Sequence, residues 1–244
     1  MDIVKTYKES IDVAKTNPLI LAPLVAVGLV MAVLSLVLVG GFARSAGMMG
    51  GMGSPAGAVG AMAGAVFFAA ILGVVGMVLY FFAHGMTVGM ANEAIETGTT
   101  SLGGGISVVT SRLPQLIVAA LIVGLAVGIG MLLLVIPGIV AAFFLAFTFP
   151  LVIIENMPAV DAVKKSIEIV KANLNDVVIM FLIAIVIGVV SAIVGGLLRF
   201  IPVVGPLAAS IINGIFGGYV TIVVVKVFIE IARKSKGTPA EANP

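Results

Sequence analysis

The sequence has 244 residues, of which 61% are hydrophobic and 10% are charged, and its formal net charge is +2. A soluble domain carries about 25% charged residues, and a disordered chain combines few apolar residues with many charges, so both classes are excluded. The chain has no cysteine and one histidine, which excludes disulfides, thiolate metal sites, a cysteine nucleophile and multi-histidine metal sites. We therefore expect an all-α integral membrane protein with no cofactor, no enzymatic activity and no nucleic-acid partner.

The first predicted element is a basic amphipathic helix over residues 3 to 17. Its apolar positions Val4, Tyr7, Ile11 and Ala14 recur with helical spacing and form one stripe. Lys5, Lys8 and Lys15 are expected to contact anionic lipid headgroups, since basic amphipathic helices lie in the headgroup region. Membrane lipids are thus the expected partners.

Six membrane-spanning helices are predicted, because a helix needs about 20 mainly apolar residues to cross the hydrocarbon core. Their expected ranges are 18 to 42, 61 to 84, 113 to 136, 138 to 154, 176 to 199 and 206 to 228. Pro137 and Gly138 are expected to form the tight turn between the third and fourth helices.

The distribution of Lys and Arg predicts the orientation, because short cytoplasmic loops retain positive charge. One side of the predicted topology holds eleven cations and the other holds Arg44 and Arg199. The protein is therefore expected in the cytoplasmic membrane, with both termini in the cytoplasm.

An internal repeat links residues 4–17 to residues 160–173 at an offset of 156, with six identical positions in fourteen. The identical pairs are Val4/Val160, Lys8/Lys164, Ser10/Ser166, Ile11/Ile167, Lys15/Lys171 and Asn17/Asn173. The second copy predicts a basic surface helix over residues 160 to 174, with Lys164, Lys165 and Lys171 as further headgroup contacts. A weaker third copy contains Leu102, Ile106 and Val109.

We expect three parallel repeats, each a surface helix followed by a transmembrane hairpin. The units span about 1–97, 98–158 and 159–233 of a single membrane domain, and residues 234–244 are expected to form a flexible tail. The alternative is coincidence, since basic amphipathic helices often precede membrane spans.

Three carboxylates, Glu93, Glu155 and Glu230, follow the even-numbered spans. They could form a ring that attracts cations, or each could dock a surface helix to its hairpin. Docking is favoured, because an acid near a helix C-terminus needs a partner. The candidate partners are Lys15, Arg112 and Lys171.

His84 and Asn213 are the remaining candidate polar positions. His84 is expected at the cytoplasmic end of the second span, as an interfacial residue or, less readily, a ligand. Asn213 is expected to form a hydrogen bond across a helix contact, with a polar cavity as the alternative. Glycine pairs spaced by four residues predict close helix packing, within one chain or between the copies of a homo-oligomer. These pairs are Gly60/Gly64, Gly85/Gly89, Gly124/Gly128 and Gly214/Gly218.

The segment from residue 44 to 64 is rich in glycine and methionine. Met48, Met49, Met52 and Met62 could offer thioethers to Cu(I), but an apolar loop at the membrane interface is the favoured interpretation.

One segment carries a family resemblance: Phe149-Pro150, then Glu155, followed by Ala162, Ser166 and Asn173 before a new span. It resembles poorly characterised six-helix membrane families that are similar to the membrane domain of some glycerophosphodiester phosphodiesterases. The resemblance covers about residues 140 to 230, and the chain lacks the phosphodiesterase domain, so it implies architecture without catalysis. The expected function is a membrane-embedded scaffold or lipid-contacting protein, and the alternative is a channel or carrier for a small solute, ion or apolar molecule.

Overall fold

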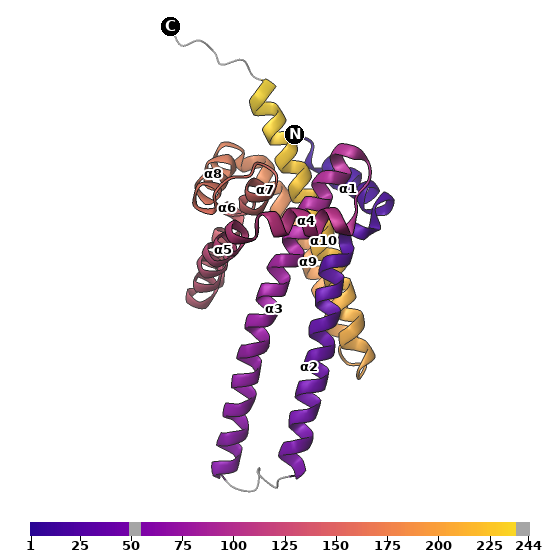
Figure 1. The fold of residues 1–244 in the computed structure, drawn as a ribbon, viewed down its shortest axis with the longest axis vertical. Helices are drawn as coiled ribbons and strands as arrows, with labels where there is room; N and C mark the ends of the chain where they lie inside the picture. Colours follow the sequence, from indigo (N-terminus) through magenta and orange to yellow (C-terminus); the bar gives the residue numbers. More distant parts are fainter. Residues whose placement is uncertain (49–54, 238–244) are drawn as a thin grey trace.

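The computed structural model describes residues 1–48 and 55–237, and every regular element in these two ranges is a helix (Figure 1). The elements are α1 (Ile3–Thr16), η1 (Pro18–Leu21), α2 (Ala22–Met48), α3 (Pro55–Thr97), α4 (Leu102–Ser111), α5 (Leu113–Leu133), α6 (Val135–Phe144), α7 (Thr148–Ile153), α8 (Ala159–Ala172), α9 (Leu174–Leu198) and α10 (Val204–Gly237).

Six helical segments in the described part of the chain are long and apolar enough to cross a membrane, which confirms the predicted all-α fold with six potential membrane-spanning helices. They are Pro18–Leu38, Met62–Thr97, Leu113–Leu133, Val135–Ile153, Leu174–Leu198 and Val204–Lys234. One of the segments that form a single unbroken helix, Leu113–Leu133, has 21 residues, which at a rise of 1.5 Å per residue gives about 32 Å, close to the thickness of the hydrocarbon core.

The second span continues past its predicted end at residue 84 and stops at Thr97. Gly85 and Gly89 lie inside this helix and face α4. A Cβ on either glycine would come within 3.2 Å of a valine of α4. A glycine that ends a helix usually adopts a positive φ, and Gly98, at φ +83°, is the residue that does so here.

The turn between the third and fourth spans falls at Leu134, three residues before the predicted Pro137-Gly138. Pro137 instead lies in the first turn of α6, where a missing N–H costs nothing. Gly138 packs against α5, since a Cβ on Gly130 would lie 2.7 Å from the Gly138 nitrogen. The fourth span is also divided into α6 and α7 by a turn at residues 145–147.

The three predicted surface helices, α1, α4 and α8, all form. They lie at the same end of the molecule, where α10 also ends (Figure 1). Each of α1, α4 and α8 directly precedes an apolar helix. The helices α1 and α8 cover equivalent positions at the offset of 156. α10 continues to Gly237, and the remaining residues of the predicted tail, 238–244, lie outside the described part.

The apolar stripe predicted for α1 and α8 is only partly buried. The equivalent pairs Ile3/Ala159, Thr6/Ala162 and Ser10/Ser166 face the core. Val4, Ile11 and Val160 instead remain 53%, 41% and 50% exposed. The buried face is offset by one residue from the predicted apolar stripe. The reason is that Thr6, Ser10 and Ser166 occupy buried positions, and a pattern of apolar residues does not count them.

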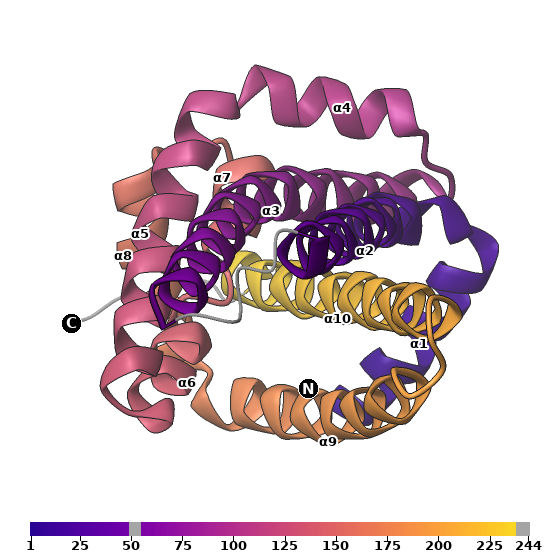
Figure 2. The same cartoon turned by 90° about the horizontal axis from the view of Figure 1, so that it is seen from below.

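The core lies at the surface-helix end of the bundle. In α3, most residues from Ala83 to Ala94 are buried, whereas its large apolar side chains from Val59 to Val78 are mostly exposed. Viewed from the opposite end, α2 lies between α3 and α10, and α4, α5, α6 and α9 form an outer layer around them (Figure 2). The protein is therefore tightly packed at one end and presents apolar helix surface at the other.

Glycine contacts confirm two of the predicted packing seams. A Cβ on Gly214 would lie 2.6 Å from the Val25 Cα, and one on Gly218 would lie 2.7 Å from Leu21, so α10 approaches α2 closely. Gly85 and Gly89 form the seam with α4 described above. By contrast, a Cβ on Gly60 or Gly128 would meet nothing within 4 Å.

Candidate functional site

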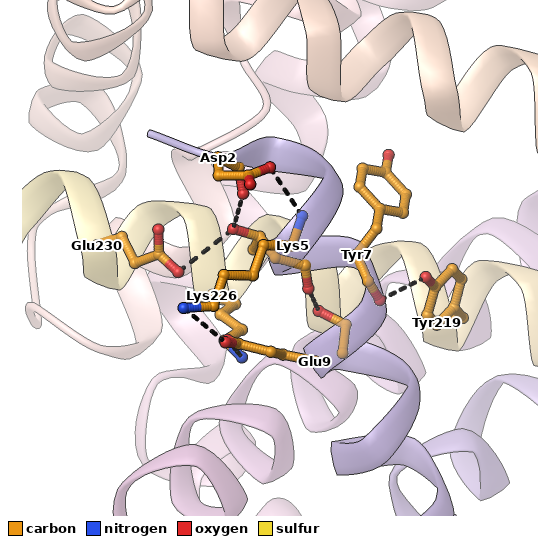
Figure 3. Close-up of polar contacts among 9 residues, drawn as sticks. Asp2, Lys5, Tyr7, Glu9, Tyr219, Lys226 and Glu230 are labelled. Atoms are coloured by element: carbon orange, nitrogen blue, oxygen red, sulfur yellow. Dashed lines mark hydrogen bonds and ion pairs between the residues drawn. The ribbon is translucent and has the colours of Figure 1, made fainter.

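Helix α1 is held against the bundle by two tyrosines (Figure 3). The Tyr7 hydroxyl donates a hydrogen bond of 2.6 Å to the Met180 carbonyl of α9. The Tyr219 hydroxyl of α10 donates one of 2.9 Å to the Tyr7 carbonyl, and the two rings meet edge to face at 6.0 Å. Burial, with a contribution from Tyr219, raises the pKa of Tyr7 above its ordinary value. Tyr7 therefore joins α1 to two spans at once.

Charged groups add to this docking. Lys226 of α10 donates to Glu9, and its hydrogen bond and charge lower the pKa of the Glu9 carboxyl. The Thr6 hydroxyl donates to Glu230 at 3.4 Å (Figure 3). The N-terminal amine lies 3.5 Å from Asp176 of α9. The predicted candidate Glu230 thus contacts a surface helix, although through a hydroxyl rather than a lysine.

Glu93 has the corresponding position at α4. It accepts hydrogen bonds from the Thr100 hydroxyl at 2.8 Å and from the Ser101 backbone N–H at 3.3 Å. Ser101 caps α4 by accepting from the Gly104 N–H, so the carboxylate lies at the positive end of the helix dipole.

The third carboxylate, Glu155, is exposed, and no hydrogen bond or ion pair among the described residues involves it. The predicted cations Lys15, Arg112 and Lys171 likewise form no ion pair within the described part of the chain. Glu93 and Glu230 thus contact their surface helices through neutral hydroxyl and backbone donors, and Glu155 does not contribute to docking among the residues that the structure describes.

His84 lies within α3 instead of at its end, in an aromatic cluster. It stacks on Tyr80 with centroids 6.0 Å apart and meets Phe149 edge to face at 5.0 Å. Its Nδ1 lies 3.3 Å from the Thr221 hydroxyl of α10. Phe149 belongs to the segment that carried the family resemblance, so His84 contributes to the packing of α3 against α7 and α10.

Ser166, also from that segment, joins α8 to the break in the fourth span. Its hydroxyl donates to the Phe144 carbonyl at 2.8 Å and accepts from the Phe147 N–H at 3.1 Å. These bonds satisfy backbone groups left without helical partners where α6 ends.

The six predicted headgroup lysines fall into two sets. Lys5 and Lys165 form ion pairs within their own helices, with Glu9 at 3.8 Å and Glu168 at 3.2 Å. The other four are exposed, and no ion pair or hydrogen bond in the described residues involves them: Lys8, Lys15, Lys164 and Lys171.

The four unpaired lysines share a face with apolar side chains, of which Val4, Ile11 and Val160 are exposed and Ile167 is half-buried. Positions 4, 8, 11 and 15 follow the i, i+4, i+7, i+11 spacing of a single helix face, and so do 160, 164, 167 and 171. Both faces have the same sequence of residue types, Val, Lys, Ile and Lys. We call these two surfaces the Val-Lys faces. Four of the six identities in the repeat therefore lie on them.

Asn213 borders a cavity of about 860 Å³ between α2, α3 and α10. The Asn213 side chain is exposed, and its amide nitrogen would lie 3.8 Å from a Cβ on Gly195 of α9. Arg199, Ser210, Ser35 and Tyr80 supply the other polar groups of the lining. These four side chains could not be predicted to lie together, because they come from four separate segments of the chain.

No group of three or more His, Asp or Glu side chains in the described residues could hold a metal ion. The side chains of Met48, Met49 and Met52, considered for Cu(I), lie outside the described part.

Comparisons with models of protein families, with curated proteins and with solved structures found no match. The resemblance to phosphodiesterase membrane domains therefore stays a prediction.

Proposed function

We propose that the protein is a non-enzymatic, membrane-embedded scaffold that contacts anionic lipids through the Val-Lys faces of α1 and α8. One observation carries the proposal: the two helices differ in their ion-paired positions but are identical on these exposed faces. Residues 5 and 9 are Lys and Glu in α1, whereas the equivalent residues 161 and 165 are Asp and Lys in α8.

The chemistry of the Val-Lys faces fits a lipid surface. An exposed valine and isoleucine can enter the headgroup boundary, while the flanking lysines reach the phosphates. Each cation near an anionic leaflet contributes about 1 kcal/mol. A face bound to another protein segment of this chain would instead be buried, whereas seven of the eight side chains on these faces are exposed and Ile167 is half-buried.

Docking of the surface helices supports the proposal of three repeated units. α4 packs on α3, α8 packs on α7, and α1 packs on α10. Each surface helix thus contacts the end of an even-numbered span, and the contact between α1 and α10 connects the first unit to the last. Such an arrangement would hold α1, α4 and α8 around one end of the bundle, and we call these three helices the collar.

Self-association could use α5, because a Cβ on Gly128 would meet nothing within 4 Å and this helix face is open.

Packing at the surface-helix end favours a scaffold over a channel. The cavity ends near Leu24 and Gly217, and beyond them Ile20, Val88 and Ile222 are fully buried. A hydrated passage through the bundle would need polar lining where these side chains pack.

Orientation is the second part of the proposal, with the collar and both termini in the cytoplasm. Because the chain has no cysteine, Lys8→Cys and Phe200→Cys give single labelling sites. In intact cells, a membrane-impermeant thiol reagent should label Phe200→Cys and should reach Lys8→Cys only after permeabilisation. The reverse pattern would contradict the orientation.

Lipid selectivity tests the function directly. We compare the double variant Lys8→Gln/Lys164→Gln with Lys5→Gln/Lys165→Gln, which removes the same charge from the ion-paired sides. The readout is the preference for spin-labelled phosphatidylglycerol over phosphatidylcholine in reconstituted bilayers. The first variant should lose several-fold in preference and the second should lose little. Equal losses, or no loss in either variant, would contradict the proposal.

A further inference from the structure

The cavity between α2, α3 and α10 has its charge at one end only. Arg199 lies in the turn between α9 and α10 and Pro206 lies in the first turn of α10, on the side of the cavity away from the collar. In Figure 1 this turn lies short of the tips of α2 and α3, which extend further from the collar. Arg199 is exposed and forms no ion pair with the described residues.

Helix register places Ser210 and Ser35 nearest to Arg199, whereas Asn213, four residues before Gly217 on α10, lies closer to the other end of the cavity. A Cβ on Gly28 would lie 3.1 Å from the Ser210 carbonyl, so these two residues are level in the antiparallel pair α2 and α10. Ser35 lies seven residues further along α2, about 10 Å closer to the Arg199 end. In the opposite direction the cavity is lined by Leu24 and Gly217, and by Tyr80, which stacks on His84.

The length of the cavity matches one leaflet. Pro206 and Gly217 are eleven residues apart on α10, which corresponds to about 16 Å. Half of the hydrocarbon core is about 15 Å. A volume of about 860 Å³ also falls within the usual range of ligand pockets, about 300 to 1,000 Å³.

We propose that this cavity binds an anionic lipid of the leaflet opposite the collar, with the phosphate at Arg199 and one acyl chain along the glycine-lined groove. A guanidinium binds a phosphate with two parallel hydrogen bonds. The Asn213 amide can donate a hydrogen bond to a headgroup or ester oxygen, whereas the hydroxyls of Ser35 and Ser210 already donate to the carbonyls of Ala32 and Leu207 in their own helices. The site is separate from the Val-Lys faces and does not depend on them.

A single tryptophan provides the probe, since the chain has none. Leu72→Trp places it in the cavity lining, and Leu125→Trp places it on the exposed surface of α5 as the control. Both are reconstituted with the same mixture of phosphatidylglycerol and phosphatidylcholine, in which an equal mole fraction of one lipid or the other is brominated.

Brominated phosphatidylglycerol should quench Leu72→Trp at least about twofold more than brominated phosphatidylcholine, whereas Leu125→Trp should show a ratio near one. Arg199→Gln should reduce the cavity ratio to about one, and Arg199→Lys should retain most of it. Tyr80→Trp is a second cavity reporter, measured on the same bilayers, should Leu72→Trp not fold.

Filling the cavity gives an independent check. A Cβ on Gly73 meets nothing within 4 Å, and the same holds for Gly128 outside the cavity. Gly73→Leu should lower quenching of the cavity reporter by either lipid, and Gly128→Leu should not.

The proposal is overturned if the cavity reporters show no preference for phosphatidylglycerol, or if the preference survives Arg199→Gln. The variants of Lys8 and Lys164 should leave it unchanged, so failure here is distinct from failure of the collar.

Discussion

The Tyr219 hydroxyl donates to the backbone carbonyl of Tyr7, 2.9 Å away and 212 positions earlier in the chain. This bond, with the Tyr7 bond to Met180, connects the first surface helix to the last two spans. The fold of the collar therefore depends on contacts between the two ends of the sequence.

Removal of either hydroxyl should loosen α1. Tyr7→Phe and Tyr219→Phe should each lower the free energy of unfolding by about 1 kcal/mol, since each loses one hydrogen bond and keeps the ring. Tyr80→Phe is the matched control, because no hydrogen bond of the Tyr80 hydroxyl occurs among the described residues. The measurement is SDS-induced unfolding in mixed micelles. An effect of the same size in Tyr80→Phe would contradict the assignment.

Stability should fall at acid pH through Glu9. The folded state lowers the pKa of this carboxyl below its ordinary value of 4.5. Its contribution is therefore complete above that pH and is lost as the pH falls through the lowered folded-state pKa. Thermal unfolding of the parent protein between pH 7 and pH 3 should show this loss, and Glu9→Gln should show a flatter profile.

The Glu168→Gln variant is the control for that profile, since Glu168 pairs only with Lys165 of its own helix in the described part. It should follow the parent. A parent profile no steeper than that of Glu9→Gln would exclude Glu9 as the cause.

The two carboxylates Glu93 and Glu155 should respond differently to neutralisation. Glu93→Gln weakens the bonds to Thr100 and Ser101 that start α4, and should cost about 1 kcal/mol. Glu155→Gln should change stability by less than about 0.5 kcal/mol, as expected for an exposed residue. Equal costs in thermal or SDS unfolding would count against the docking role of Glu93.

Two glycines should differ sharply in their tolerance of a side chain. Gly214→Ala forces α10 away from the backbone of α2 at Val25 and should destabilise the protein by about 1 to 3 kcal/mol. Gly128→Ala adds a methyl group in open space and should be neutral or slightly stabilising, because alanine favours the helix. Unfolding of the two variants side by side provides the measurement, and comparable destabilisation of both would mean that α5 packs on another surface.

Hydrophobicity was sufficient to predict the six apolar helices, because each is bounded by charges or prolines. The three surface helices were also predictable, since charge and apolar spacing mark α1 and α8 clearly. The end of α3 was not, because Gly85 and Gly89 suit a buried seam as well as a helix end, and only the φ of Gly98 distinguishes the two.

The polar site was harder to predict. Glu93, Glu230 and Asn213 were identified as polar positions, but their partners were not, because Thr6, Thr100 and Ser101 carry no charge. The cavity around Arg199 depends on the register between α2 and α10, which the sequence alone does not specify. The division of the lysines into ion-paired and unpaired sets was also not predictable, because it depends on which lysines Glu9 and Glu168 contact in the folded protein.

The most direct test of the central claim is the depth of the Val-Lys faces in a bilayer. Spin labels on single cysteines at Ile11 and Ile167 should be accessible to oxygen dissolved in the lipid and protected from an aqueous nickel chelate. Labels at Lys5 and Lys165, on the ion-paired sides of the same helices, should be accessible to the chelate. Equal chelate accessibility at all four positions would contradict the proposal that α1 and α8 lie on the lipid surface.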